Sequence, residues 1–274
     1  MPNNGSVVVR EFKVGRYKQP SGYYSALEFE ISGWTAEAAD LTARKDLAAA
    51  YDSSANLTFA IDGYGATDIL ATNNAYSHAS NAWTAEAADL TARVDLAAAY
   101  DSSANLTFAI DGYGGTNVFT TNNAYSHASN AWTAEAADLI ARWELAAAYD
   151  SSAILTFAID GYGGTNVLTT NNAYSHASNA WTAEAADLTA RRGIVAAYDS
   201  SATLTFAIDG NGITNVLTTN NAYSHASNAW TAEAADLTAR WYLAAAYDSS
   251  ANLTFAIDGY GGTNVFTTNN AYIY

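Results

Sequence analysis

Residues 83–131 read "WTAEAADLTARVDLAAAYDSSANLTFAIDGYGGTNVFTTNNAYSHASNA", and this stretch decides the fold because the chain repeats it almost letter for letter. The tryptophan that opens it recurs with a constant spacing of 49 residues, at Trp34, Trp83, Trp132, Trp181 and Trp230. Repeats of about 20–50 residues are typical of propellers, solenoids and other arrays, in which each copy forms one structural unit. The sequence therefore predicts five equivalent units.

Within one copy, the pattern predicts strands and turns, although residues 84–101 are rich in alanine and have high helix propensity. Their apolar positions do not keep the 3.6-residue period of an amphipathic helix. The following residues 105–112, "NLTFAIDG", alternate apolar and polar letters and end in a turn signal, as a strand does. The glycines of 111–117, "DGYGGTN", allow a tight reversal before the chain extends again. Each copy is therefore predicted to be a small β-sheet.

The landmarks of each copy resemble the kelch repeat. In the second copy Tyr125 stands thirteen residues after Gly112, Trp132 follows seven later and Arg142 ten after that. Four copies share this whole spacing, and the fifth shares it from Gly259 to Tyr272. One departure is regular, because an aspartate replaces the first glycine of the kelch doublet in every copy. These aspartates are Asp62, Asp111, Asp160, Asp209 and Asp258. Asp-Gly is itself a favoured turn pair, so we expect a turn at this position.

The resemblance implies an all-β, five-bladed kelch-like β-propeller of near-identical 49-residue repeats, each a four-stranded blade with Trp and Tyr filling the wedge between blades. Strands a, b, c and d are expected in "LAAAYD", "LTFAID", "VFTTNNAY" and "WTAEAADL". We expect residues 34–274 to form the propeller and 1–33 to form a leader with extra strands. The repeats start near residues 35, 84, 133, 182 and 231.

The order of the strands bears on closure. The repeats begin with a d strand after Trp34 and end with a c strand near Tyr274, so the N-terminal d strand is expected to close the last blade. Closure would remove the exposed sheet edges that promote aggregation. The leader segments "SVVVREFKVG" and "YYSALEFEIS" also alternate like strands. A degenerate sixth blade, a strand swapped between subunits and an open solenoid therefore stay open as alternatives.

Composition excludes several classes of partner. With 27 acidic and 11 basic residues the net charge is −16, and such a surface repels nucleic acids and anionic membranes, so neither is an expected partner.

The chain has no cysteine, so it forms neither disulfides nor thiolate metal sites. No run approaches 18 apolar residues, and the first residues lack the pattern of a signal peptide. The compartment stays unknown, with the cytoplasm favoured.

The repeats also argue against catalysis. An active site needs chemically different side chains at one place, whereas near-identical blades place the same side chain at the equivalent position of each blade. We therefore expect no enzymatic activity, no metal and no cofactor. The histidines of the "YSHASN" turns would lie about a blade apart on the surface. The aspartates of "YDSSAN" are predicted to form Asx turns in the a–b hairpin rather than to bind calcium.

The copies differ chiefly at the two residues after the repeated arginine. These exposed pairs are Lys45 and Asp46, Val94 and Asp95, Trp143 and Glu144, Arg192 and Gly193, and Trp241 and Tyr242. In the b–c turn, the tyrosine of the other copies (Tyr113, Tyr162 and Tyr260 among them) is Asn211 in the fourth copy. In a blade the d–a and b–c turns share one face, so these positions are predicted to surround one rim of the ring.

We interpret this rim as a partner-binding face. Trp, Tyr and Arg are the residues most enriched in binding hot spots, and loops commonly carry function. The hypothesis is a non-enzymatic binding or scaffold module for a protein or peptide, with drift at tolerant positions as the plainer explanation. One alternative is a multivalent lectin with a site per blade, built from repeated residues such as Asn122, Tyr125 and His127. Another is a structural protein that forms an oligomer or filament through its leader.

Overall fold

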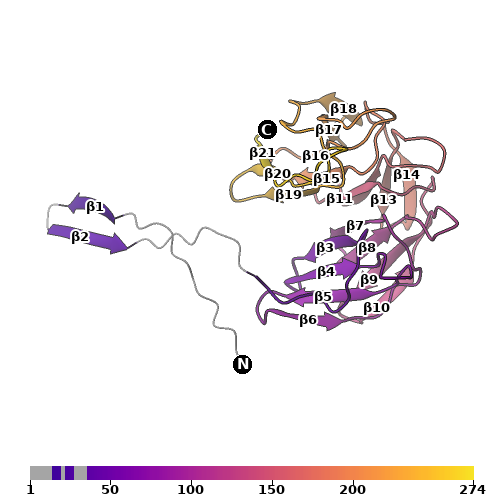
Figure 1. Cartoon of the computed structure of the whole chain (residues 1–274), viewed down its shortest axis with the longest axis horizontal. Coiled ribbons are helices and arrows are strands. Elements are labelled where there is room, and N and C mark those ends of the chain that lie inside the picture. Colours follow the sequence, from indigo (N-terminus) through magenta and orange to yellow (C-terminus); the bar gives the residue numbers. More distant parts are fainter. Residues whose placement is uncertain (1–13, 20–21, 28–35) are drawn as a thin grey trace. The chain divides into compact units, whose positions relative to one another are not determined.

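The computed structural model describes residues 14–19, 22–27 and 36–274 (Figure 1). The chain divides into two compact units, Met1–Ala38 and Ala39–Tyr274. In the first unit, β1 (Val14–Gln19) pairs with β2 (Gly22–Leu27) as an antiparallel hairpin. Trp34, where the predicted closing strand begins, lies outside the described residues.

The second unit consists of five antiparallel sheets, one for each repeat, whose strands follow one another in chain order. Blade 1 contains β3 (Ala48–Asp52), β4 (Leu57–Ile61), β5 (Asn73–Ser77) and β6 (Ala82–Ala85). Blade 2 contains β7 (Ala97–Asp101), β8 (Leu106–Ile110), β9 (Asn122–Ser126) and β10 (Ala131–Ala134). Blade 3 contains β11 (Ala146–Asp150), β12 (Leu155–Ile159), β13 (Asn171–Ser175) and β14 (Ala180–Ala183). Blade 4 contains β15 (Val195–Asp199), β16 (Leu204–Ile208), β17 (Asn220–Ser224) and β18 (Ala229–Ala232). Blade 5 contains three described strands, β19 (Ala244–Asp248), β20 (Leu253–Ile257) and β21 (Asn269–Tyr272).

The blades are arranged around a common centre with their first strands innermost (Figure 1). Inner strand β3 packs against β7, β7 against β11, β11 against β15, and β15 against β19. The architecture is a five-bladed β-propeller, which confirms the predicted all-β fold and the assignment of one blade to each repeat. No helix in the described part of the chain has the length and apolar character of a membrane span.

Strands c and d are shorter than predicted. In blade 2, strand c begins at Asn122 instead of Val118, and Val118 forms only an isolated bridge with Tyr113. The intervening backbone has other partners, because the Thr121 carbonyl accepts a hydrogen bond from Arg93 and the Thr120 carbonyl accepts one from the Asp138 amide. The Thr121 carbonyl also accepts a hydrogen bond from the Asp111 amide at 2.7 Å, so the contact between strands b and c continues irregularly here and the regular ladder starts at Asn122.

The hydrophobic core lies between the blades, where two different faces meet. Phe108 and Ile110 of blade 2 pack against Tyr174 and Trp181 of blade 3, and the same contact recurs at the neighbouring junctions. The polar ends of the aromatic residues are satisfied, since Trp181 Nε1 donates to the Ala136 carbonyl at 2.8 Å. The aromatic residues therefore fill the wedge between blades, as the sequence predicted.

A buried arginine joins each pair of neighbouring blades, and sequence reasoning missed it. Arg142 of blade 3 is fully buried; its Nε donates to Asp111 of blade 2 at 3.2 Å and its Nη2 to Asp138 at 2.6 Å. Its Nη1 donates to the Thr170 carbonyl at 3.2 Å. The aspartate that replaces the first kelch glycine therefore carries the inter-blade ion pair as well as the turn.

The glycine after this aspartate is required by its backbone and its surroundings. Gly112 has φ of 103°, and its amide donates to the Arg142 carbonyl of the next blade at 2.9 Å. A Cβ at this position would lie 2.9 Å from the Val94 carbonyl oxygen. Only glycine accepts both constraints at low cost. The Asp-Gly pair is thus the point at which one blade is fastened to the next.

Candidate functional site

The second residue of each variable pair belongs to an inner ring around the centre of the propeller. All five have left-handed backbones, with φ between 51° and 58°: Asp46, Asp95, Glu144, Gly193 and Tyr242. The amides of the last four donate to the carbonyl of the counterpart in the preceding blade, from Asp95 N to Asp46 O at 3.0 Å through to Tyr242 N to Gly193 O at 2.9 Å. This chain of backbone bonds places one residue from each of the five repeats at one opening, four of them with a side chain.

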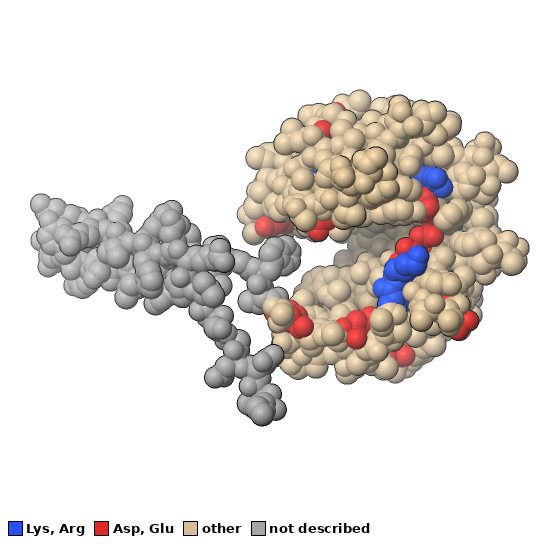
Figure 2. All heavy atoms as spheres, in the orientation of Figure 1, with Lys and Arg blue, Asp and Glu red and all other residues tan. Residues whose placement is uncertain are grey.

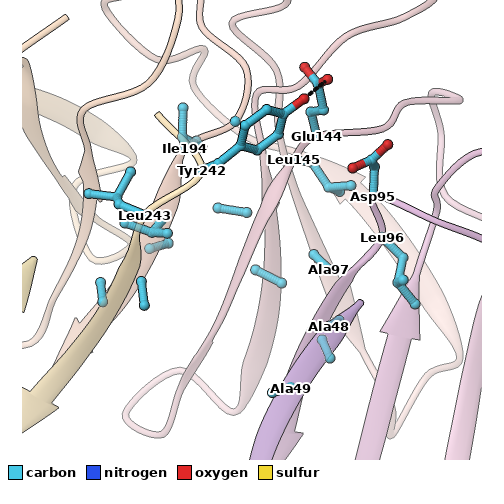
Figure 3. A pocket seen from close by; sticks show the side chains of 18 of the residues that line it. Ala48, Ala49, Asp95, Leu96, Ala97, Glu144, Leu145, Ile194, Tyr242 and Leu243 are labelled. Atoms are coloured by element: carbon cyan, nitrogen blue, oxygen red, sulfur yellow. Dashed lines mark hydrogen bonds between the residues drawn. The ribbon is translucent and has the colours of Figure 1, made fainter. Parts of the chain in front are cut away.

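The inner ring surrounds the mouth of a central cavity of about 630 Å³. Figure 3 shows Asp95, Glu144 and Tyr242 near the opening and leucine and alanine side chains farther along the wall. The wall comes from the beginning of each inner strand and includes Leu47, Leu96, Leu145, Ile194 and Leu243. The site is therefore a cavity with an acidic mouth and an apolar wall, a combination that suits binding of an amphipathic group.

The carboxylates at the mouth lie close enough to influence one another. Glu144 is only 6% exposed; its Oε1 accepts a hydrogen bond from the Tyr242 hydroxyl and its Oε2 lies 3.3 Å from Arg192 Nη1. Burial raises the pKa of Glu144. Burial, followed by the nearby charges of Asp46 and Glu144, raises the pKa of Asp95 to about 7. The charge of the mouth therefore changes near neutral pH.

The first residue of each pair belongs to an outer ring and bridges to the b–c turn of its own blade. These antiparallel bridges join Lys45 to Tyr64, Val94 to Tyr113, Trp143 to Tyr162, Arg192 to Asn211 and Trp241 to Tyr260. The outer ring thus combines both sets of residues predicted from sequence, and it lies on the face that the inner ring also occupies. The prediction that d–a and b–c turns share one face is confirmed.

The outer ring contains a row of aromatic rings and one guanidinium in contact across blades 2 to 5. The Trp143 ring lies 5.4 Å from Tyr113 and 5.7 Å from Tyr162. The Arg192 guanidinium follows, 5.0 Å from the Tyr162 ring and 5.7 Å from the Trp241 ring. These side chains are half-buried, and aromatic and cation–π contacts of this kind hold them in fixed positions. The row is therefore an ordered surface.

The prediction that the variable pairs are exposed is wrong for most of them. Lys45, Asp46 and Tyr242 are exposed. Three are buried (Val94, Glu144 and Gly193) and four are half-buried (Asp95, Trp143, Arg192 and Trp241). Val94 is 7% exposed because it packs beneath the b–c turn of its blade, and Glu144 is buried by its contacts with Arg192 and Tyr242. The variable pairs therefore contribute to packing as well as to surface. In the view of Figure 2, the Lys and Arg atoms lie beside Asp and Glu atoms in the central hollow of the repeat unit.

The opposite face carries the "YSHASN" and "YDSSAN" turns. Asp101 Oδ1 accepts hydrogen bonds from the Ser103 and Ala104 amides at 2.8 and 3.1 Å, which confirms the predicted Asx turn. Among the described residues no group of three His, Asp or Glu side chains is placed to hold a metal ion. Asn122 and Tyr125, two of the residues named for a sugar site, are buried in the core.

Comparison with known proteins defines the fold. No family model matches the chain, and no curated protein matches its sequence. Among solved structures the chain is similar to that of YjhT, a kelch-repeat protein, with a TM-score of 0.73 and 12% sequence identity. The match covers 88% of this chain and 85% of YjhT. The fold is that of a β-propeller. This match concerns the fold alone. The inner ring, the buried arginines and the mouth are described from the structure of this chain.

Proposed function

We propose that the chain is a non-enzymatic, kelch-like binding module that recognises a protein or peptide at the mouth defined by the inner and outer rings. One observation carries the proposal. The positions that differ between otherwise near-identical repeats are brought together around one cavity, where they form an ordered row of Trp, Tyr and Arg side chains. Residues of these types contribute most of the binding energy at protein interfaces.

The chemistry of the mouth favours a ligand that is both apolar and basic. Asp95 supplies the carboxylate that attracts a cation, since Glu144 pairs with Arg192 and Asp46 with Lys45, while the leucine and alanine wall favours an aliphatic stem. A lysine or arginine side chain combines these features, because its long apolar stem carries a charged end. The outer aromatic row would then contact the flanking residues of the peptide. We propose binding without catalysis because the repeats place the same side chains at the equivalent position of each blade.

The test compares two faces of the same molecule. Display of a random peptide library selects ligands for the full chain, and fluorescence anisotropy then measures their affinity for two variants. The mouth variant carries Trp143→Ser, Arg192→Ser and Trp241→Ser; the control carries His78→Ser, His127→Ser, His176→Ser and His225→Ser on the opposite face. We expect the mouth variant to lose roughly tenfold or more in affinity, as hot-spot residues do, and the control to bind normally.

A glycan array probed with the same variants distinguishes the lectin hypothesis from the proposed protein or peptide binding. Binding of sugars that survives in the mouth variant would favour one repeated site per blade and would contradict the proposed face. Far-UV circular dichroism and thermal unfolding of each variant establish that the fold is retained, so a lost affinity reports on the mouth itself.

A further inference from the structure

The buried arginine at each of the four junctions between consecutive blades faces two aspartates. Arg142 Nε lies 3.2 Å from Asp111 Oδ2, and its Nη2 lies 2.6 Å from Asp138 Oδ2, with all three side chains fully buried. The same arrangement recurs with Arg93, Asp62 and Asp89; with Arg191, Asp160 and Asp187; and with Arg240, Asp209 and Asp236. One positive charge therefore meets two carboxyl groups, and full ionisation would leave an unpaired negative charge away from water.

The two aspartates of a pair have different hydrogen-bond surroundings. Asp138 Oδ1 accepts from the Leu139 amide at 2.6 Å and from Asn172 Nδ2 at 2.7 Å. Asp111 Oδ2 accepts the longer bond from Arg142, and its buried Oδ1 has no hydrogen-bond partner among the described residues. An ionised carboxylate can only accept hydrogen bonds, and burying it without donors is costly. These surroundings suit an ionised Asp138 and a protonated Asp111.

No further cation is available to the second carboxyl within the described part of the chain. The Asp111 carboxyl faces Arg142 and Asp138, and its main-chain carbonyl accepts a hydrogen bond from Arg93 Nη1 at 3.2 Å. Arg93 is itself bound by the two aspartates of the preceding junction. The equivalent carbonyls of Asp62, Asp160 and Asp209 accept in the same way from Arg44, Arg142 and Arg191, at 3.1–3.4 Å.

The pair between blades 4 and 5 shows opposite pKa shifts in its two members. Burial, followed by a hydrogen bond with Asp236, raises the pKa of Asp209. Burial also acts to raise the pKa of Asp236, but hydrogen bonds from Asp209, Asn270 and Arg240 outweigh it and lower that pKa. Two coupled carboxyl groups that divide in this way share one proton.

We propose that each of the four aspartate pairs holds one proton at neutral pH, with the Asp-Gly aspartate protonated and donating a hydrogen bond to its ionised partner. The arginine then neutralises the one negative charge of the pair, and the folded chain is four charges less negative than its formal −16. In alkaline solution the proton leaves to solvent and the junction keeps an unpaired carboxylate. Because the four sites are alike, all four junctions weaken over the same pH interval.

Counting charges tests the proton directly. Asp111→Asn suits the left-handed backbone at φ of 56°, and its amide donates to Asp138 in place of the carboxyl proton. The control is Asp248→Asn, because hydrogen bonds from the Ser250 hydroxyl and amide lower the pKa of Asp248, which is therefore ionised at neutral pH. Capillary electrophoresis at about pH 7 compares the mobility of each folded variant with that of the parent.

We expect Asp248→Asn to change the mobility by one unit charge and Asp111→Asn to leave it unchanged, because the amide replaces a carboxyl that is already neutral. An equal shift in the two variants would mean that both aspartates of the pair are ionised, and would overturn the proposal. Infrared spectroscopy of the parent chain needs no variant. Carbon-13 labelling of the aspartate carboxyls should shift a band of protonated carboxyl groups at neutral pH, and the absence of that band would also overturn the proposal.

Urea unfolding tests the alkaline weakening. Between about pH 6 and about pH 8 the folded pair holds a proton that the unfolded aspartates have lost, so the stability of the parent should fall as pH rises. Each such proton raises the unfolding equilibrium constant about tenfold per pH unit, so Asp111→Asn should rise about tenfold less per unit than the parent. Asp248→Asn should follow the parent, and a parallel course for Asp111→Asn would contradict the weakening.

The inference is independent of the ligand proposed for the mouth, because the aspartate pairs lie between the blades. If the charge count failed, the proposed binding face would still stand on its own test.

Discussion

Replacing Arg142 by methionine tests whether the buried arginines hold the blades together. Met keeps much of the apolar volume but leaves Asp111 and Asp138 without the guanidinium that lies 3.2 and 2.6 Å from them. Both carboxylates are fully buried. Breaking a buried ion pair by removing one partner costs about 3–5 kcal/mol. For a unit of this size, that predicts a fall in melting temperature of roughly 6–20 °C.

The loss should depend on pH, and its sign follows from Asp111. Burial, followed by the charge of Asp138, raises the pKa of Asp111 well above its ordinary value. A carboxyl group with a raised folded pKa makes no difference to stability at low pH and destabilises the fold as pH rises through the interval between its unfolded and folded pKa values. Without Arg142 this interval widens, so the variant should lose more stability at about pH 8 than at about pH 5.

The assay is urea unfolding followed by circular dichroism and by tryptophan fluorescence, with Lys45→Met as the control. Lys45 has a side chain that is 73% exposed, so its replacement should change the free energy of unfolding by less than about 0.5 kcal/mol. If Arg142→Met unfolded within that same margin of the parent at about pH 8, the proposed role of the buried arginines would be refuted.

Three further predictions concern the parent fold. Burial raises the pKa of Asp95 to about 7, so its ionisation should lower the free energy of unfolding as pH rises from about 4 to about 7, and Asp95→Asn should reduce that fall; urea titrations in which the variant and the parent show the same pH dependence would disprove it. Asp101→Ala removes an acceptor of two backbone amides and should cost about 1–3 kcal/mol in thermal unfolding, while the exposed Ser102→Ala serves as a neutral control. Phe157→Ala empties a fully buried position between blades 3 and 4 and should cost about 3–5 kcal/mol, and a loss below about 1 kcal/mol would mean that the inter-blade core is not where the stability resides.

Much of the architecture could be predicted because the repeat is nearly exact. The spacing of the tryptophans set the number of blades, and the alternation in "NLTFAIDG" located a strand and its turn. Strands c and d were predicted too long, because the sequence does not show that the Thr120 carbonyl accepts from the Asp138 amide or that the Thr121 carbonyl accepts from Arg93 as well as from the Asp111 amide. The pairing of Arg142 with Asp111 was missed because the two residues belong to different blades. Their constant separation of 31 residues, which recurs four times, was the available signal.

The candidate site was predicted in outline and differs in detail. Connectivity alone placed the d–a and b–c turns on one face, and the bridges between Trp143 and Tyr162 and their equivalents confirm this. The inner ring was not foreseen, because Glu144 and Tyr242 are not residues that favour a left-handed backbone. Gly193 and the aspartates at the same position of the first two copies do favour it, so the signal was present in three of five repeats.

Hydrogen exchange on the chain bound to a selected peptide is the most direct measurement of the proposed binding face. The amides of the b–c and d–a turns, around residues 113–117, 143–144 and 162–166, should exchange more slowly in the complex. Those of the "YSHASN" turns on the opposite face should exchange at the rate of the free chain. Slowed exchange at the "YSHASN" turns with no change around the mouth would contradict the account.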